Sequence, residues 1–263
     1  MTNSRPSSQQ TAPVAVEVRG AQKIFPNGVR ALEATDLVVR EGEFATIIGP
    51  SGCGKSTLLR LIAGLVLPTG GQIHLSSQSR SAGLAFVFQS PTLMPWASVE
   101  ANVRLPLDLI GAARDRADEK VRHALDLVGL KDFARLYPRE LSGGMQMRAS
   151  IARALVTSPR LLLLDEPFGA LDEITRNRLD RDLSELCARE KLTVLFVTHS
   201  IYEAVFLSSR VLVMSARPGR IFEEVAIDEP QPRRDAFRAT EKFARLSAGL
   251  SGTLAAAMHE AAA

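Results

Sequence analysis

Apolar residues follow two different spacings along the chain, and the spacing predicts where strands and helices lie. In the first third, short runs rich in valine, isoleucine and leucine favour strands bounded by glycine and polar residues. These predicted strands cover residues 14–18, 31–39, 44–48, 71–75 and 84–89. Between the third and fourth runs the apolar residues change to a helical spacing, which predicts a buried helix. Its apolar residues are Leu58, Leu59, Leu61, Ile62 and Leu65.

The second half of the chain returns to strands that are almost entirely apolar, at residues 161–164, 193–197 and 210–214. Continuous apolar strands separated by helices are typical of a parallel sheet that is covered on both faces. One long helix is predicted between the first two of these strands. Its expected buried face carries Leu171, Ile174, Leu179, Leu183 and Leu186.

Residues 98–156 look mostly helical and interrupt the strand-rich pattern. Within them an amphipathic stripe recurs at offsets of 4, 7, 8 and 11 residues. The stripe consists of Ala117, Val121, Ala124, Leu125 and Val128. We therefore predict a nucleotide-binding core with a helical subdomain inserted at about residues 91–156.

The two ends of the chain have their own compositions. Residues 1–13 are mostly Ser, Thr, Gln, Asn and Pro, which predicts a disordered leader. Residues 14–227 form the predicted main domain, and residues 228–263 form a linker followed by a helical tail. Gly249 and Gly252 are expected to weaken the tail helix. Its apolar residues at helical spacing are Phe243, Leu246, Leu250, Leu254 and Met258.

Composition narrows the class of protein. The 263 residues are 46% hydrophobic and 23% charged, with a net charge of +3, as in a folded globular protein of one large or two small domains. The apolar runs, such as residues 61–67, fall far below the ~20 residues of a membrane-spanning helix, which excludes an integral membrane protein. Two cysteines, Cys53 and Cys187, suggest a reducing compartment. The sequence contains no run of Lys and Arg residues, so it gives little support to nucleic-acid binding.

The strongest motif lies between the predicted strand at residues 44–48 and the helix after it. Residues 49–56 fit G-x-x-x-x-G-K-[ST], a phosphate-binding loop whose backbone N–H groups point at phosphate oxygens. Lys55 supplies a charge between the β- and γ-phosphates, and Ser56 offers a hydroxyl to Mg²⁺. The alternative is a glycine-rich turn without a ligand. The residues expected to contact ATP are Gly49, Pro50, Ser51, Gly52, Cys53, Gly54, Lys55, Ser56 and Thr57.

Two carboxylates follow the apolar run at residues 161–164. Because the carboxyl end of a buried parallel strand lies at the ligand-binding edge of the sheet, Asp165 can support Mg²⁺ beside Ser56. Glu166 is one residue further and can act as a general base on a water in line with the γ-phosphate. A strand-end cap or a surface salt bridge is the alternative for this pair.

At this point the chain resembles the ATP-binding subunits of ABC transporters, over about residues 14–227. The most specific match is Leu141-Ser142-Gly143-Gly144, which resembles the ABC signature. A Ser N-cap followed by two glycines opens a helix with free N–H groups, which makes a second anion site. The resemblance implies a phosphate-loop NTPase core of class α/β, with a mainly parallel sheet, an antiparallel β part and a helical subdomain. It also implies a head-to-tail homodimer, because in the family this signature closes on the γ-phosphate held by the other subunit.

The resemblance assigns further roles residue by residue. Gln89 resembles the glutamine that joins Mg²⁺ and the attacking water to the helical subdomain. His199 resembles the switch histidine that contacts the γ-phosphate. Asp172 resembles the aspartate at the dimer seam. Phe25 resembles the aromatic residue that stacks on adenine, although a plain core position is the alternative for it.

A narrower resemblance is carried by residues 88–96 and 166–172, which look like the nitrate/sulfonate/taurine importer branch. Residues 145–148 and 198–200 look closer to relatives that carry thiamine-precursor pyrimidines or riboflavin. The branch implies two membrane permease subunits, an extracytoplasmic solute-binding protein, and a peripheral place on the cytoplasmic face of the inner membrane. Trp96 and Met94 then line a permease-docking groove, or Trp96 packs internally.

Two other classes stay open on sequence grounds. A soluble ABC-type ATPase acting on ribosomes or DNA usually joins two cassettes or inserts a long coiled coil, and the chain shows neither. A phosphate-loop kinase for a small molecule needs an acceptor pocket and has no use for the signature at residues 141–144. Neither class requires a permease.

Overall fold

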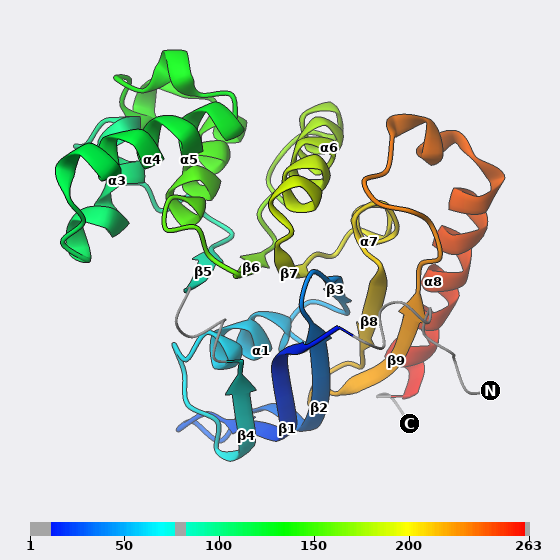
Figure 1. Ribbon diagram of the computed structural model, residues 1–263. Coiled ribbons are helices and arrows are strands. Elements are labelled where there is room, and N and C mark those ends of the chain that lie inside the picture. Colours follow the sequence, from blue (N-terminus) through cyan, green and yellow to red (C-terminus); the bar gives the residue numbers. More distant parts are fainter. Residues whose placement is uncertain (1–11, 77–82, 261–263) are drawn as a thin grey trace.

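The computed structural model describes residues 12–76 and 83–260, and it consists of two sheets, a group of helices above them and a carboxyl-terminal helix (Figure 1). Most of the predicted leader, residues 1–11, lies outside the described residues. No helix within the described ranges is both long and apolar enough to cross a membrane.

A six-stranded sheet forms the centre of the chain, in the order β5-β6-β7-β3-β8-β9. All neighbouring strands are parallel except β8 and β9, which are antiparallel. The sequence did not predict β9, because its residues are only half-buried and include two glutamates. The strands are β3 (Phe44–Ile48), β5 (Leu84–Val87), β6 (Leu161–Asp165), β7 (Thr193–Val197), β8 (Arg210–Met214) and β9 (Ile221–Ala226).

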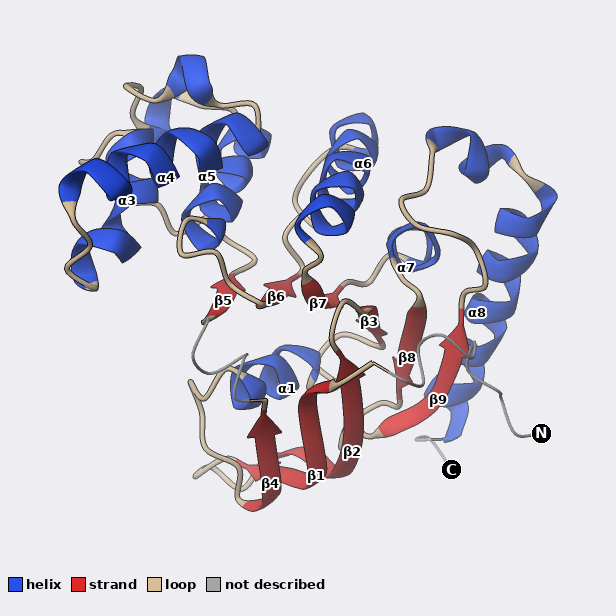
Figure 2. Cartoon of the chain, in the orientation of Figure 1, coloured by secondary structure: helices blue, strands red, loops and turns tan. Residues whose placement is uncertain are grey.

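A smaller antiparallel sheet packs below the central one in the view of Figure 2. Its order is β2-β1-β4, and it comprises β1 (Val14–Ile24), β2 (Arg30–Arg40) and β4 (Gly70–Leu75). Helix α1 (Lys55–Ile62) lies between the two sheets, and its Leu58 and Leu59 are fully buried there. The predicted class, a mainly parallel sheet with an antiparallel β part and a helical subdomain, is confirmed.

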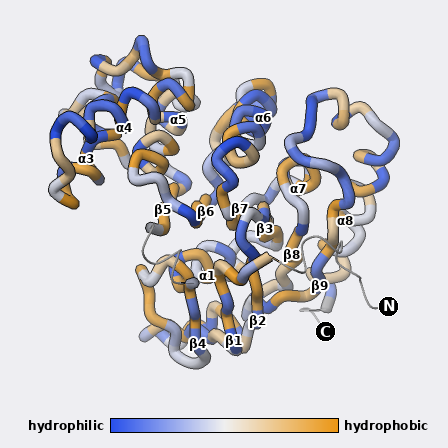
Figure 3. The backbone as a smooth tube through the Cα atoms, in the orientation of Figure 1, coloured by the Kyte–Doolittle hydropathy of each residue, from blue (hydrophilic) through white to orange (hydrophobic). Residues whose placement is uncertain are grey.

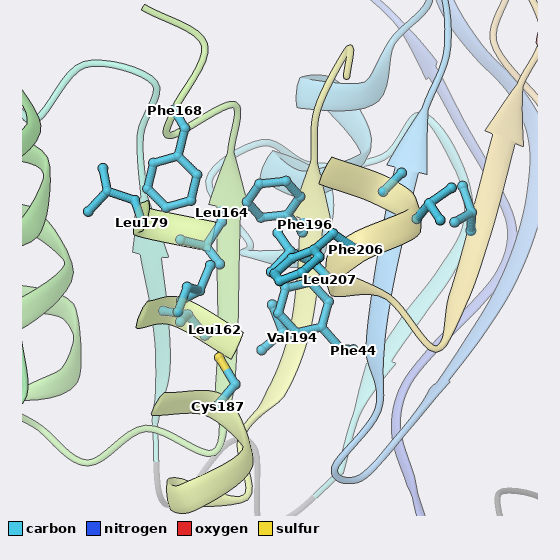
Figure 4. Packing of buried hydrophobic residues seen from close by; sticks show 14 of the residues in the cluster. Phe44, Leu162, Leu164, Phe168, Leu179, Cys187, Val194, Phe196, Phe206 and Leu207 are labelled. Carbon is cyan, nitrogen blue, oxygen red and sulfur yellow. The ribbon is translucent and has the colours of Figure 1, made fainter. Parts of the chain in front are cut away.

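The central strands are buried because alternate side chains enter different cores. Leu162 and Leu164 of β6 pack toward the helices, whereas Leu161 and Leu163 pack toward α1 and the antiparallel sheet. On the helical face the ring centroid of Phe196 lies 6.0 Å from that of Phe44 and 6.1 Å from that of Phe168 (Figure 4). Each fully buried phenylalanine contributes about 1.5–3 kcal/mol of hydrophobic free energy.

Helices α6 (Glu173–Glu190) and α7 (Ile201–Leu207) cover that face. Leu179, Leu183 and Leu186 of α6 are buried, as predicted. The prediction was wrong for Ile174, whose side chain is 85% exposed. The helix begins only after Asp172, so Ile174 lies in its first turn and faces away from the core.

The helical subdomain has a hydrophobic core of its own. Helices α3 (Val99–Leu109), α4 (Arg114–Leu127) and α5 (Gly143–Leu155) enclose it, together with the short 3₁₀ turns η1 (Lys131–Phe133) and η2 (Pro138–Glu140). The predicted stripe lies at this core, with Ala117 and Val121 at most 1% exposed. The hydropathy colouring in Figure 3 shows α4 as a largely hydrophilic helix, so its apolar stripe is narrow.

The carboxyl-terminal segment packs on its own chain. It consists of η3 (Asp235–Ala239) and α8 (Glu241–Glu260), and Phe237, Phe243 and Leu250 join the core on the helical face. Gly249 and Gly252 do not interrupt α8, because both lie on its exposed side. The residues before it are held as well: buried Arg233 donates to the carbonyls of Val205 and Phe206.

Candidate functional site

The loop between β3 and α1 has a backbone that only glycines adopt without strain. Gly52 and Gly54 have φ angles of +75° and +106°, and a Cβ at Gly54 would lie 2.7 Å from the Ala31 carbonyl oxygen. Gly54 is also the N-cap of α1 and offers no capping side chain, so the first N–H groups of the helix have no partner from that residue. A helix N-terminus of this kind favours an anion.

Lys55 is held over this loop. Its ammonium group donates to the carbonyl oxygens of Gly49, at 2.9 Å, and Pro50, at 3.0 Å, and the side chain is 5% exposed. The nearest carboxylate oxygen, Oε1 of Glu166, lies 4.0 Å from Nζ. The positive charge is therefore concentrated at the loop.

Ser56 and Asp165 form a pair of oxygen ligands beside the loop. The Ser56 hydroxyl donates to Oδ1 of Asp165 at 2.7 Å, and Asp165 is 4% exposed. Burial raises the pKa of Asp165, while the Ser56 hydrogen bond and Arg60, 3.9 Å from Oδ2, act in the opposite direction. A hydroxyl and a carboxylate are oxygen donors of the kind that Mg²⁺ prefers, so the pair fits that ion.

Glu166 follows β6 in a strained backbone conformation. Its φ angle is +48°, a region that non-glycine residues rarely adopt and that is often stabilised at functional sites. Its N–H donates to the Val197 carbonyl at 2.9 Å, which fixes the residue to the end of β7. Its Oε2 lies 3.2 Å from Nδ1 of His199, so the two predicted catalytic side chains are in contact.

A cavity of about 240 Å³ brings most of these residues together with Phe25. Phe25 is half-buried and belongs to none of the buried core clusters, which favours the predicted ligand-contacting position over a core position. Cys53 is 1% exposed, and burial raises the pKa of its thiol, so it fills the loop from behind. The cavity is lined by Phe25, Val29, Ala31, Ser51, Gly52, Gly54, Lys55, Ser56, Thr57, Glu166 and Arg217.

Sequence reasoning missed Arg217, which enters the cavity from the turn between β8 and β9. Its Nε donates to the Gly52 carbonyl at 3.1 Å. Gly219 of the same turn donates to the Ala31 carbonyl and accepts from the N–H of Glu33, both at 3.0 Å. The turn is thereby fixed against the phosphate-binding loop. No local motif signals this position, because the contacts join residues that are far apart in the sequence.

The signature residues lie at a different place. Ser142 is the N-cap of α5 and accepts from the N–H of Met145 at 3.3 Å. A Cβ at Gly144 would lie 3.0 Å from the Thr175 methyl group, so this end of α5 packs against the start of α6. There Asp172 accepts from the Thr175 N–H at 3.0 Å, and that bond lowers the pKa of Asp172.

These residues and Gln89 are not brought into the cavity. None of residues 142–144, 172 and 89 is among the described residues that line it. β5 ends at Val87, two residues earlier than predicted, and Gln89 is exposed in the bend that follows. Asp165 and His199 are not among the described lining residues either, but they contact Ser56 and Glu166, which are. The predicted second anion site lies elsewhere.

The chain is similar in sequence to known proteins. Residues 32–169 match the family model described as ABC transporter. An uncharacterized ABC transporter ATP-binding protein of Methanocaldococcus jannaschii is 49% identical over 226 residues, covering 84% of this chain and 85% of its own. The aliphatic sulfonates import ATP-binding protein SsuB of Bacillus cereus is 42% identical over 229 residues, covering 84% and 89%.

Among solved structures, a dimeric ATP-binding cassette in a post-hydrolysis state with ADP and Pi aligns with a TM-score of 0.71. It is 31% identical, and the alignment covers 82% of this chain and 100% of that one. A cassette from Clostridium perfringens, part of an ABC transporter complex, aligns with a TM-score of 0.75 at 25% identity, covering 89% and 94%.

The docking of the β8–β9 turn generates a prediction about stability. A Cβ at Gly219 would lie 1.9 Å from the Cys53 carbonyl oxygen, so Gly219→Ala must displace the turn from the loop. We expect the free energy of unfolding to fall by about 1–3 kcal/mol, measured by urea denaturation. Gly249→Ala is the matched control, because nothing lies within 4 Å of its added methyl group. It should stabilise α8 by roughly 0.5–1 kcal/mol, and equal stabilities for the two variants would contradict the described packing.

Proposed function

The chain belongs to the ABC transporter family of ATP-binding proteins and is an ATPase, and from this we propose that it is the ATP-hydrolysing subunit of a solute importer of the nitrate/sulfonate/taurine type. The observation that carries the proposal is the cavity that combines Lys55, Glu166 and Phe25 on one chain while the signature at residues 142–144 lies outside it. The import role is supported by the sulfonate import proteins among its relatives.

The cavity suits a magnesium nucleotide. Loop N–H groups and the Lys55 ammonium group bind the phosphates, and the half-buried ring of Phe25 offers a face for the base. Ser56 and Asp165 would hold Mg²⁺, which when bound would neutralise charge on the transferred phosphoryl group. Arg217 adds a second cation beside Gly52.

Hydrolysis requires a proton acceptor for the attacking water, and Glu166 is the carboxylate that the cavity provides. His199 holds that carboxylate by its 3.2 Å contact and contributes a polar group on the γ-phosphate side. Gln89, exposed after β5, reaches the site when the helical subdomain closes.

The second anion site is supplied by another copy of the chain. The N-terminus of α5, with Ser142, Gly143 and Gly144, binds the γ-phosphate of the partner, and Asp172 lies at the seam. Two copies placed head to tail then enclose two ATP molecules. A related cassette of known structure is dimeric with ADP and Pi bound, which supports this arrangement.

The segment before α3 provides the surface for the permease. Arg153 of α5 donates to the Pro91 and Thr92 carbonyls at 2.9 and 2.8 Å, and Asn102 accepts from the Met94 N–H at 2.7 Å. The backbone is therefore fixed, yet Trp96 is 76% exposed. A rigidly presented, exposed tryptophan is typical of an interface anchor.

We infer from this docking surface that the chain lies at the cytoplasmic face of the membrane, on two permease subunits that receive solute from an extracytoplasmic binding protein. A soluble ATPase of the ribosome or DNA type, or a small-molecule kinase, would need no such surface. Copurification of a permease with the chain separates the importer from both.

Binding of the base generates the first functional prediction. Phe25→Ala should weaken ATP binding by ~1–3 kcal/mol, the usual value of base stacking, and Phe25→Tyr should be nearly neutral. Because a ring face reads no hydrogen bonds, ATP and GTP should bind similarly. Titration with a fluorescent nucleotide measures both effects. Phe133→Ala, a partly exposed ring in η1, is the control. Unchanged affinity in Phe25→Ala would place Phe25 outside the site.

Glu166→Gln should lower hydrolysis by ~10²–10⁴-fold, because it removes the base and keeps the shape of the side chain. ATP binding should persist, so the variant should accumulate as an ATP-bound dimer in size-exclusion chromatography. Lys55→Ala should lose binding and dimer together. Hydrolysis by Glu166→Gln within about threefold of the parent would exclude Glu166 as the base and leave His199 to be tested.

Trp96→Ala should abolish transport or assembly with the permease, measured in proteoliposomes, while the ATPase activity of the free subunit survives. Leu67→Ala is the matched control, because Leu67 is an equally exposed apolar residue, 77% exposed, in the connection between α1 and β4. Loss of solubility in Trp96→Ala, or equal loss of transport in both variants, would argue against the docking surface.

A further inference from the structure

The carboxyl-terminal segment contacts the central core through a half-buried arginine. Arg238 of η3 donates from Nη2 to Oδ2 of Asp180 at 2.7 Å, and its guanidinium carbon lies 3.8 Å from the centroid of the Phe206 ring. Asp180, on α6, is 0% exposed. An Asp at a fully buried position is stable only when such a partner compensates its charge.

One turn earlier on α6, Arg176 acts on Asp180 only through its charge, and it contacts the loop before the helix. Its Nη2 donates to the Leu171 carbonyl at 2.7 Å, and its Nε lies 3.8 Å from Oε1 of Glu203. Leu171 precedes Asp172, the residue predicted to lie at the dimer seam. Arg176 therefore ties the backbone of that loop to α7.

Glu203 of α7 extends the connection to the histidine. Its Oε2 accepts from the hydroxyl of Thr198, and the Thr198 oxygen accepts from the N–H of Ser200 at 2.9 Å. Thr198 and Ser200 flank His199 on both sides. The buried Glu203 carboxylate thus fixes the backbone that presents His199 to Glu166.

The four residues comprise two guanidinium groups and two carboxyl groups, but not all of their polar atoms are hydrogen-bonded. Two guanidinium groups face two carboxylates, and one atom of each residue has no hydrogen-bond partner among the described residues. These atoms are Nε of Arg176, Oδ1 of Asp180, Oε1 of Glu203 and Nε of Arg238. Burial raises the pKa of both Asp180 and Glu203. Arg238 opposes that increase at Asp180, so its loss would favour the protonated Asp180 carboxyl group and change how the remaining residues pair.

We propose that Arg238 is a positioning residue for hydrolysis: through Asp180, Arg176 and Glu203, the carboxyl-terminal segment holds the loop at residues 169–172 and the segment at 198–200 in their working arrangement. The inference rests on the proposed roles of Glu166 and His199. The carboxyl-terminal segment would thus influence catalysis from outside the nucleotide cavity. None of the four residues is among the described residues that line that cavity.

The test compares Arg238→Met with the parent at a temperature well below unfolding. We expect kcat to fall by about tenfold or more, because small misplacements of catalytic groups have effects of that size. The dissociation constant for a fluorescent ATP analogue should stay within about twofold, because the variant leaves the phosphate loop intact. Amide hydrogen exchange at residues 169–172 and 198–200 should accelerate. Arg238→Lys should retain most activity, and Arg245→Met, the same change at an exposed position of α8, should alter nothing.

If Arg238→Met fails to fold, the double variant Asp180→Asn with Arg238→Met serves as the second test. The double variant removes the buried charge and the link together, so it should regain thermal stability while kcat stays low. Recovery of kcat in the double variant, or unchanged exchange at the two loops in either variant, would overturn the proposal. Hydrogen exchange can be measured without ATP hydrolysis, so it tests the role of Arg238 independently. Absence of ATPase activity in the parent would contradict the proposed function instead.

Discussion

The whole structure depends on bringing bare backbone close to an anion. Amide groups bind phosphate only where no side chain shields them, which requires glycine at Gly52 and Gly54, and glycine alone holds no fixed shape. The surrounding elements supply the shape. β3 is fixed at the centre of the sheet between β7 and β8, α1 leaves the loop at once, and the β8–β9 turn presses on it through Gly219.

The sequence predicts a feature best when the residues that determine it are close together in the chain. The phosphate loop, Asp165, Glu166 and His199 are readable because each follows an apolar strand, and parallel strands bring their carboxyl ends to one edge. β9 was missed because its burial is partial, and Ile174 was misassigned because the N-cap at Asp172 sets the start of α6. Arg217 and Arg238 have no local signal, since their partners lie far away in the chain.

Two hydrophobic clusters, one at the central sheet and one among the helices of the subdomain, organise this part of the chain. The central sheet shares its helical-face core with the carboxyl-terminal segment and with Met147, Ile151 and Leu155 of α5, whereas a second cluster lies within the helical subdomain. Arg153 and Asn102 tie the segment before Trp96 to the helices of the subdomain. The signature begins α5, the helix that carries Arg153, so under the proposed function closing on a nucleotide and acting on a permease involve the same helix.

If Glu166 is the base, as proposed, its positive φ sets folding and turnover against each other at a single position. A glycine there would relax the backbone and give a more durable protein, at the expense of the carboxylate. On that proposed role, selection for heat resistance alone would favour loss of the carboxylate and with it an inactive chain. Thermostabilised versions of the protein are better sought at exposed α8 positions such as Gly249, where no such conflict exists.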